Sequence, residues 1–294
     1  MSYSLPAVSY TSSGESLARK LRRKIFMAVS RIELVVSEID GTLVTTNHEL
    51  TSATKRAAVD LYYSGVRLCL VSSRPPKSIR PYVRELGLRT PYVSFNGALI
   101  QLPDGQTLAG STIPTTITQR IKLIAGKFGL DVWLYDEKAW YAQLHTPFIE
   151  REAASSGFRP EMENYAALLK QPMTKLTVVG NPEIVAQVET RVRGEMSQYV
   201  TASRSKPRHL DITAKGWDKS AALQRLAELL NVKLERIAVI GDSPNDVPMF
   251  QQAGLSIAMG QTVDNVKLYA TRTTTSNDDD GWAKAMDAYI LQRP

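Results

Sequence analysis

The sequence predicts an α/β fold with a mostly parallel sheet, into which a separate α+β domain is inserted. From residue 32 onward, short runs rich in valine, isoleucine and leucine alternate with segments of helical period, which is the pattern of βαβ units. Between about residues 113 and 205, helical and strand-like segments interleave without this regular alternation. We therefore expect a core domain from residues 27–112 and 206–294, and an inserted domain at 113–205.

Four apolar runs predict the strands of the parallel sheet. Each run is followed directly by polar or glycine residues, and ligands of open α/β sheets bind beyond the carboxyl ends of the strands. Polar groups that are far apart in the sequence are therefore expected to converge on one crevice. The runs are residues 32–36, 68–71, 237–240 and 255–259, and they lead into residues 37–42, 72–75, 241–246 and 260.

The inserted segment predicts a smaller domain of mixed structure. Its tryptophans and tyrosines are expected to pack in the core of that domain, because large aromatic side chains contribute mainly to packing. Helices are expected near residues 117–128, 161–170 and 182–196, and strands at 132–135, 140–144 and 176–179.

Composition indicates a soluble globular protein. Hydrophobic residues make up 43% of the 294 residues and charged residues 22%, and no apolar stretch is as long as a membrane-spanning helix requires. The single cysteine, Cys69, lies in an apolar run at 66–71, so an intramolecular disulfide is impossible and Cys69 is expected to behave as a small buried hydrophobe. These features predict a cytoplasmic protein in a reducing compartment.

The positive net charge is concentrated at the amino terminus. Of the formal charge of +7, residues 1–26 carry +4, from five basic residues against Glu15. We expect a basic, disordered extension there, and no nucleic-acid partner for the rest of the chain. The alternatives for this segment are an organellar transit peptide, a membrane-surface helix and a polyanion-binding arm.

Two carboxylates, Glu38 and Asp40, follow the first apolar run and are separated by one apolar residue. Because successive side chains on a strand alternate between faces, both carboxylates begin on the same side. Like charges at this spacing favour a bound cation, and Asp242 at the end of another predicted strand would complete an oxygen-rich site for Mg²⁺. The alternative for the pair alone is that one acid caps the following turn while the other is exposed.

Four segments occur in an order that is typical of one enzyme superfamily. They are SEIDGTL at 37–43, VSSR at 71–74, Lys219 within GWDKSAAL at 216–223, and GDSPND at 241–246 with AMG at 258–260. In this order they resemble the four motifs of the haloacid-dehalogenase (HAD) superfamily, and specifically of its Cof-type phosphatases. The resemblance covers the chain from about residue 32 to the end, including SFNGALI at 94–100 and SNDDDGW at 276–282. It implies a Rossmann-like core with an α+β cap domain inserted between the second and third motifs.

The resemblance also implies a role for each matching position. Glu38 stands where the family has a nucleophilic aspartate that attacks phosphorus, and Asp40 would protonate the leaving alkoxide and then activate water. Glu38, Asp40 and Asp242 would bind Mg²⁺, and Asp246 would support the metal or Lys219. The residues expected to bind the phosphoryl group or the rest of the substrate are Ile39, Ser72, Ser73, Lys219 and Asn245.

Other polar residues near these motifs receive no catalytic role from the sequence. Arg74, which precedes two prolines, is expected to be structural or to lie at the rim of the site. No partner is evident for His48, and the other two histidines lack the spacing of metal ligands. Cap-domain residues near Lys175 and within 204–208 are candidates for the entrance to the site.

Glu38 limits what the resemblance implies. One additional methylene group moves its carboxylate more than about 1 Å from where an aspartate would place it, and a misplacement of about 1 Å can cost roughly a hundredfold in rate. The first hypothesis is a Mg²⁺-dependent phosphohydrolase that acts on a small phosphorylated metabolite, such as a sugar phosphate, through an acyl-phosphate intermediate. The second is a phospho-ligand binding or regulatory protein on the same scaffold, and a third makes the basic residues 1–26 the functional part. The physiological substrate and the oligomeric state are not indicated by the sequence.

Overall fold

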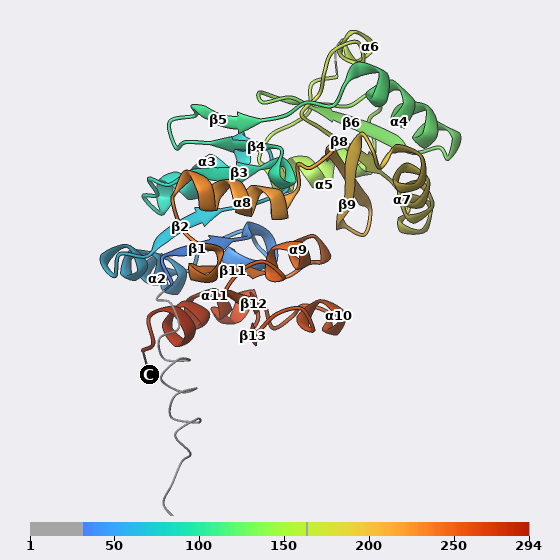
Figure 1. Ribbon diagram of the computed structural model, residues 1–294. Helices are drawn as coiled ribbons and strands as arrows, with labels where there is room; N and C mark the ends of the chain where they lie inside the picture. The colour runs from blue at the N-terminus through green and yellow to red at the C-terminus, as the bar shows by residue number, and fades with distance from the viewer. Residues whose placement is uncertain (1–31, 163, 294) are drawn as a thin grey trace, which may run out of the picture. The chain divides into compact units, whose positions relative to one another are not determined.

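The computed structural model describes residues 32–162 and 164–293 (Figure 1), so the expected basic extension at 1–26 lies outside the described residues. Five strands form the core sheet: β1 (Leu34–Ser37), β2 (Arg67–Leu70), β11 (Ile237–Gly241), β12 (Leu255–Ala258) and β13 (Arg272–Thr273). They are parallel and lie in the order β13-β12-β11-β1-β2. The predicted α/β class with a parallel sheet is therefore confirmed.

Strand β1 lies between β11 and β2. Leu34 is opposite Ile237 on one side and opposite Arg67 on the other. The alternation of side chains sends Val35 into one apolar cluster and Val36 into the cluster on the opposite face, so β1 is buried on both faces. The loops after β1, β2 and β11 therefore begin next to one another at one edge of the sheet.

Helices cover both faces of the parallel sheet (Figure 1). They are α2 (Ser52–Tyr63), α3 (Pro76–Glu85), α8 (Lys219–Leu229), α9 (Val247–Phe250), α10 (Asp264–Lys267) and α11 (Gly281–Ala285). α2, α3 and α11 pack on the face of Val35, and α8 and α9 pack on the face of Val36. Cys69 is buried on the second face, as predicted, and burial raises the pKa of its thiol to about 12. Within the described residues, no helix has the length and apolar character needed to cross a membrane.

A small antiparallel sheet connects the core with the cap domain. It consists of β3 (Tyr92–Ser94), β4 (Leu99–Gln101) and β5 (Thr107–Gly110). Val93 of β3 forms a bridge to Val71, just beyond β2, so this sheet continues from the edge of the core. The sequence analysis predicted no strands here, because runs of three or four residues are too short for periodicity to identify.

The cap domain contains a second sheet, which is antiparallel and has the order β7-β6-β8-β10-β9. Its strands are β6 (Asp131–Tyr135), β7 (Trp140–Tyr141), β8 (Lys175–Val179), β9 (Val200–Lys206) and β10 (His209–Ala214). Its helices are α4 (Thr115–Lys127), α5 (Pro147–Ser156), α6 (Tyr165–Leu168) and α7 (Pro182–Met196). Val132, Leu176 and Ile212 of neighbouring strands share one apolar cluster with α4 and α7. Trp133 and Trp140 are buried, as predicted for aromatic side chains of this segment.

Three elements between residues 140 and 170 differ from the sequence prediction. The helix expected at 161–170 is reduced to α6, which begins after Asn164 in a left-handed conformation with φ of 63°. The strand expected at 140–144 ends at Tyr141, because the backbone of Ala142 donates to the carbonyl of Glu161 instead of continuing the ladder with β6. Helix α5 was not predicted.

The hairpin of β9 and β10 spans the expected end of the cap domain at residue 205. Asp211 of β10 lies opposite both Thr177 of β8 and Ser203 of β9, so both strands belong to the cap sheet. We therefore place the end of the cap domain after Ala214. Leu210, Asp211, Ile212 and Thr213 alternate between apolar and polar residues, so a signal for this strand is present in the sequence although the sequence analysis did not use it.

Gly97 allows the turn between β3 and β4 to lie against the start of α8. Its φ of 109° is a conformation that favours glycine. A Cβ atom at this position would overlap the backbone carbonyl of Asp218, whose side chain accepts a hydrogen bond from the N–H of Ala221 in the first turn of α8. This close approach therefore helps to place Lys219, the first residue of α8.

We predict that Gly97→Ala lowers the free energy of unfolding by about 2 kcal/mol or more, because backbone strain is combined with overlap on Asp218. Gly87→Ala is the matched control: its φ is also positive, at 62°, but no atom lies within 4 Å of the position its Cβ would take. The control is expected to lose about 1 kcal/mol from strain alone. Equal losses in urea denaturation would contradict the packing role of Gly97.

Candidate active site

The loop after β1 begins with Glu38, which is buried with 5% of its surface exposed. Its backbone N–H donates to the carbonyl of Ile240 at 3.0 Å, which holds this loop beside β11. Gly41 has a positive φ of 66°, and a Cβ atom there would lie 2.6 Å from Oδ2 of Asp242. The hydroxyl of Thr42 donates to Oδ1 of Asp242 at 3.0 Å. The loops after β1 and β11 are therefore in direct contact.

Lys219 is the first residue of α8 and is 2% exposed. Its ammonium group forms ion pairs with the carboxylates of Glu38 and of Asp246, the latter at 2.7 Å. Burial opposes the charge on Lys219, but Asp246 and Glu38 outweigh this effect and hold the pKa of Lys219 above its ordinary value. Side chains from three of the predicted motifs therefore meet in one buried ion-pair cluster.

Asp246 also shapes the loop after β11. Its Oδ2 accepts hydrogen bonds from the backbone N–H groups of Asp242 and Ser243, each at 3.1 Å, while its Oδ1 contacts Lys219. Burial, together with the charges of Asp246 and Glu38, raises the pKa of Asp242 well above its ordinary value. Asp246 thus fixes the backbone from which Asp242 projects.

Asp40 forms a separate ion-pair group with Arg74. Nε of Arg74 donates to Oδ2 of Asp40 at 2.7 Å, and Nη2 donates to Oδ1 at 2.6 Å, which is a bidentate arrangement. Nδ1 of His48 lies 3.2 Å from Oδ1 of Asp40. Burial would raise the pKa of Asp40, but the hydrogen bonds from Arg74 and His48 outweigh it and hold the pKa well below its ordinary value.

The sequence analysis missed both partners of Asp40. Arg74 is 7% exposed and contacts Asp40 directly, so it lies inside the site rather than at its rim. Its place at the end of the second motif was the only signal in the sequence. His48 gave no signal, because its contact depends on a loop in which His48 itself takes a positive φ of 64°.

The phosphate-binding residues predicted after β1 and β2 lie where these strands end. Ser72 is fully buried, and its hydroxyl accepts a hydrogen bond from the N–H of Arg74 at 3.3 Å. The carbonyl of Ser73 accepts one from Nζ of Lys175 at 3.0 Å. Ile39 is fully buried and its side chain packs in the apolar core, so a contact with a ligand would have to be made by its backbone.

A chain of hydrogen bonds joins Asn245 to the cap domain. Nδ2 of Asn245 donates to Oδ1 of Asn96 at 3.1 Å, and Nδ2 of Asn96 donates to Oδ2 of Asp211 at 2.8 Å. Asp211 is 2% exposed, and it pairs with Lys175 at 3.2 Å and accepts a hydrogen bond from Thr177 at 2.8 Å. Two buried charges of the cap sheet are therefore connected to a predicted phosphate-binding residue of the core.

This connection was not predicted from the sequence. Asn96 lies in the segment SFNGALI, but nothing in the sequence assigned it a partner. Lys175 was expected near the entrance, whereas the structure places it at 4% exposure beside Asp211. A lysine and an aspartate separated by 36 positions have no local pattern that links them.

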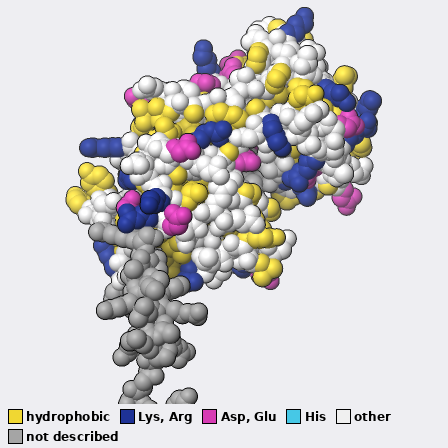
Figure 2. Space-filling model, viewed as in Figure 1, with side chains coloured by type: hydrophobic (Ala, Val, Ile, Leu, Met, Phe, Trp, Pro, Cys, Tyr) yellow, Lys and Arg dark blue, Asp and Glu magenta, His cyan; other side chains and the backbone are white. Residues whose placement is uncertain are grey.

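A cleft of about 690 Å³ lies between the core and the cap domain. Lys219, Asp242 and Asn245 line it from the core, and Arg193 and Arg204 line it from α7 and β9. Figure 2 shows Lys and Arg side chains gathered over the cap domain. Glu189 also lines the cleft and pairs with both arginines, each at 2.9 Å, so these three cap residues together carry a single net positive charge.

The charges around Lys219 suit a bound cation. Glu38, Asp242 and Asp246 bring three carboxylates to one lysine, and none of the ion pairs within the described residues includes Asp242. Carboxylate oxygens are the donors that Mg²⁺ prefers, so the donor types of the predicted ligands suit this metal. As the side chains stand, the described part of the chain contains no group of three or more His, Cys, Asp or Glu spaced to hold a metal ion. Of the three predicted metal ligands, Glu38 is paired with Lys219 and Asp40 is paired with Arg74.

Comparison with known proteins relates this geometry to a family. Residues 35–286 match the family described as haloacid dehalogenase-like hydrolase. The chain is 25% identical over 262 residues to the 5-amino-6-(5-phospho-D-ribitylamino)uracil phosphatase YitU of Bacillus subtilis, covering 87% of this chain and 97% of that protein. It is 23% identical over 226 residues to the HMP-PP phosphatase of Cronobacter sakazakii, covering 77% of this chain and 83% of that protein.

The fold is also found in solved structures. A haloacid dehalogenase-like hydrolase from Bacteroides thetaiotaomicron matches with a TM-score of 0.79 and 26% identity, covering 88% of this chain and 99% of that one. The resemblance stated from the four sequence motifs is therefore confirmed.

We predict that Asp211→Asn lowers the free energy of unfolding by about 3 kcal/mol, because it leaves Lys175 buried without its counter-ion. Burial would raise the pKa of Asp211, but Lys175 and neighbouring hydroxyl groups hold it below its ordinary value. The stabilisation from the pair is thus present above the ordinary aspartate pKa of about 4 and is lost as the pH falls through the lower folded-state value.

The difference between wild type and Asp211→Asn is therefore expected to shrink below about pH 4 in urea denaturation. Glu195→Gln, which removes a carboxylate from an exposed cap-domain pair with Arg191, is the control and is expected to change stability little. A stability difference that does not vary with pH would contradict this account.

Proposed function

The chain belongs to the haloacid dehalogenase-like hydrolase family, and we propose that it is a Mg²⁺-dependent phosphohydrolase that acts on a small phosphorylated metabolite. One observation carries the proposal: Lys219 and Asp242 line a cleft, and the ammonium group of Lys219 pairs with Glu38, two residues before Asp40. Phosphoryl transfer needs positioned cations and an acid/base group more than it needs elaborate covalent chemistry. The named activities of the two relatives, both phosphatases of small phosphorylated compounds, support this substrate class.

Binding of the phosphoryl group follows from the positive charge and the backbone at the strand ends. Lys219 would neutralise phosphoryl oxygens, and the hydroxyl of Ser72 with the backbone of Ile39 and Ser73 would donate hydrogen bonds to them. Asn245, positioned by Asn96, would contact the same group. When bound by Asp242 with Glu38 and Asp40, Mg²⁺ supplies further neutralisation of the phosphoryl charge.

The proposed reaction has two steps that use Glu38 and Asp40. A carboxylate oxygen of Glu38 forms a bond to phosphorus while the bond from phosphorus to the ester oxygen breaks, and Asp40 gives a proton to the departing oxygen. Asp40 then takes a proton from water, which attacks phosphorus and releases phosphate and the Glu38 carboxylate. Arg74 orients Asp40 through two hydrogen bonds, and this pair must loosen when Asp40 carries the proton.

A second function is favoured by the contact that Glu38 makes. Its carboxylate is paired with Lys219 in the buried cluster, so the longer side chain is used to hold a lysine. If this pair does not open, the protein would bind a phosphorylated ligand without hydrolysing it.

We predict that hydrolysis of sugar phosphates requires Mg²⁺ and that kcat falls by about 100-fold or more in Asp40→Asn, because the leaving alkoxide loses its proton donor. Release of phosphate is measured with Mg²⁺ and with EDTA, using alkyl rather than nitrophenyl esters, since a nitrophenolate leaves without a proton. Asp104→Asn, at an exposed aspartate between β4 and β5, is the matched control and should retain activity. Full turnover in EDTA or in Asp40→Asn would argue against the proposal.

We further predict that Glu38→Gln abolishes turnover, because it removes the attacking oxygen, and that Glu38→Asp retains it. Rapid quenching of the wild-type reaction should give a phosphoryl adduct that mass spectrometry assigns to Glu38. If the wild type is inactive and Glu38→Asp is active, the binding function is favoured instead. Inactivity of both proteins would reject hydrolysis of the substrates tested.

A further inference from the structure

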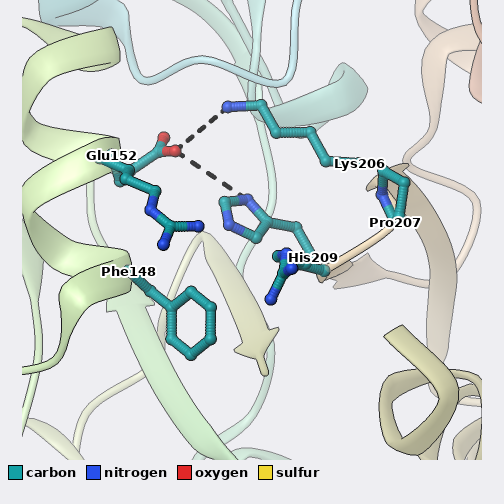
Figure 3. Close-up of a pocket in the computed structure, with 7 residues that line it drawn as sticks. Phe148, Glu152, Lys206, Pro207 and His209 are labelled. Carbon is teal, nitrogen blue, oxygen red and sulfur yellow. Dashed lines mark hydrogen bonds and ion pairs between the residues drawn. The ribbon is translucent and has the colours of Figure 1, made fainter. Parts of the chain in front are cut away.

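The cap domain contains a small pocket that the proposed chemistry does not use. It has a volume of about 190 Å³ and lies between α5 and the turn from β9 to β10 (Figure 3). At about 30 Å³ for each water molecule, this space would hold about six waters, and hence a phosphate or carboxylate group. Its walls are formed by Phe148, Arg151, Glu152, Lys206, Pro207, Arg208 and His209.

Two of the charged groups in this pocket balance each other. Lys206 pairs with Glu152 at 3.2 Å, and Nδ1 of His209 lies 3.9 Å from the same carboxylate, as Figure 3 shows. Burial lowers the pKa of His209, so its ring is neutral at pH 7. The net charge of the pocket therefore comes from its two arginines.

Arg151 and Arg208 are not neutralised by a carboxylate. Among residues 32–162 and 164–293, no ion pair includes either guanidinium group. Both contact one aromatic side chain, since their guanidinium carbons lie 5.9 Å and 5.7 Å from the ring centre of Phe148. Two like charges that share one ring repel each other, and an anion bound between them would remove this cost.

The pocket adjoins the active-site cleft. Lys206 and Pro207 line both the pocket and the cleft that contains Lys219. Burial raises the pKa of Asp40, and the hydrogen bonds from Arg74 and His48 lower it. The charge of Lys206 also lowers this pKa, so Lys206 is close enough to Asp40 to interact with it electrostatically. A substrate with its phosphate beside Lys219 and its leaving group beside Asp40 would extend toward the pocket.

Helix α5, which forms one wall of the pocket, is held against the core. The hydroxyl of Ser78 in α3 donates to the carbonyl of Ser156 at the end of α5. Lys77 of α3 lies 4.8 Å from the ring centre of Phe158. Because α3 follows directly on the segment that carries Arg74, these contacts place the pocket on the Asp40 side of the site.

We propose that this pocket binds a second anionic group of the substrate, a phosphate or a carboxylate carried by the leaving group. Arg151 and Arg208 would pair with that group, and Phe148 would support both guanidinium planes. The inference rests on the proposed phosphohydrolase function, since the first phosphate must lie beside Lys219. The preferred substrates are then phosphate monoesters with a second negative charge, rather than esters of neutral alcohols.

The test compares fructose 1,6-bisphosphate with fructose 1-phosphate and fructose 6-phosphate. Their dissociation constants are measured by calorimetry with Mg²⁺ in the full chain carrying Asp40→Asn, which slows turnover. The bisphosphate is expected to bind about tenfold more tightly than either monophosphate, since hydrogen bonds to charged groups are the strong ones. This advantage should disappear in Arg151→Gln/Arg208→Gln and return in part in Arg151→Lys/Arg208→Lys.

The matched control is Arg159→Gln/Arg191→Gln, which removes the same charge from the cap domain outside the pocket. It should keep the preference for the bisphosphate. Equal binding of the three compounds, or an equal loss in the control, would overturn the inference.

Hydrolysis by the chain without the Asp40 change separates the two proposals. If none of the three compounds is hydrolysed but the bisphosphate preference depends on Arg151 and Arg208, the phosphohydrolase function fails for these compounds and the pocket inference stands. If the monophosphates are hydrolysed and the bisphosphate has no advantage in binding, the pocket inference alone fails.

Discussion

The buried ammonium group of Lys219 is the interaction on which the site depends. It lies between Glu38 after β1 and Asp246 after β11, and so joins the ends of two neighbouring strands to the first turn of α8. Removing three charged groups from water is costly unless they pair, so each carboxylate stabilises the lysine and depends on it. Charged groups that the fold holds in fixed positions can stabilise charge that develops on a bound ligand.

The charged residues of the site form two groups: the bidentate pair of Asp40 and Arg74, and the cluster around Lys219. Because Arg74 neutralises Asp40, this carboxylate adds little to the excess negative charge around Lys219. Among the described residues Asp242 forms no ion pair, and it lines the cleft between the core and the cap domain. The hydrogen bonds from Asn245 through Asn96 to Asp211 connect this part of the core to the cap domain, so the side-chain amide of Asn245 depends on the position of the cap sheet.

Glu38 directly follows a regular strand. Its N–H donates to the carbonyl of Ile240, and Ser37 before it is in register with Leu70 of β2. The longer side chain reaches Lys219 instead, whereas an aspartate on the same backbone would end about 1.5 Å short, the length of one carbon–carbon bond.

The sequence by itself determined the fold class and the set of charged groups at the strand ends, because apolar runs and the polar residues after them are local patterns. Those patterns predicted β1, β2, β11 and β12 and placed Glu38 and Asp246 after neighbouring strands, whereas Lys219 was assigned to the site only through the resemblance to a family. Only the tertiary structure decided which charges pair, as in Arg74 with Asp40 and Asp211 with Lys175, and that the β9–β10 hairpin belongs to the cap sheet. Such pairings depend on distances of a few ångströms between segments that are remote in the chain, and no local pattern of residues encodes those distances.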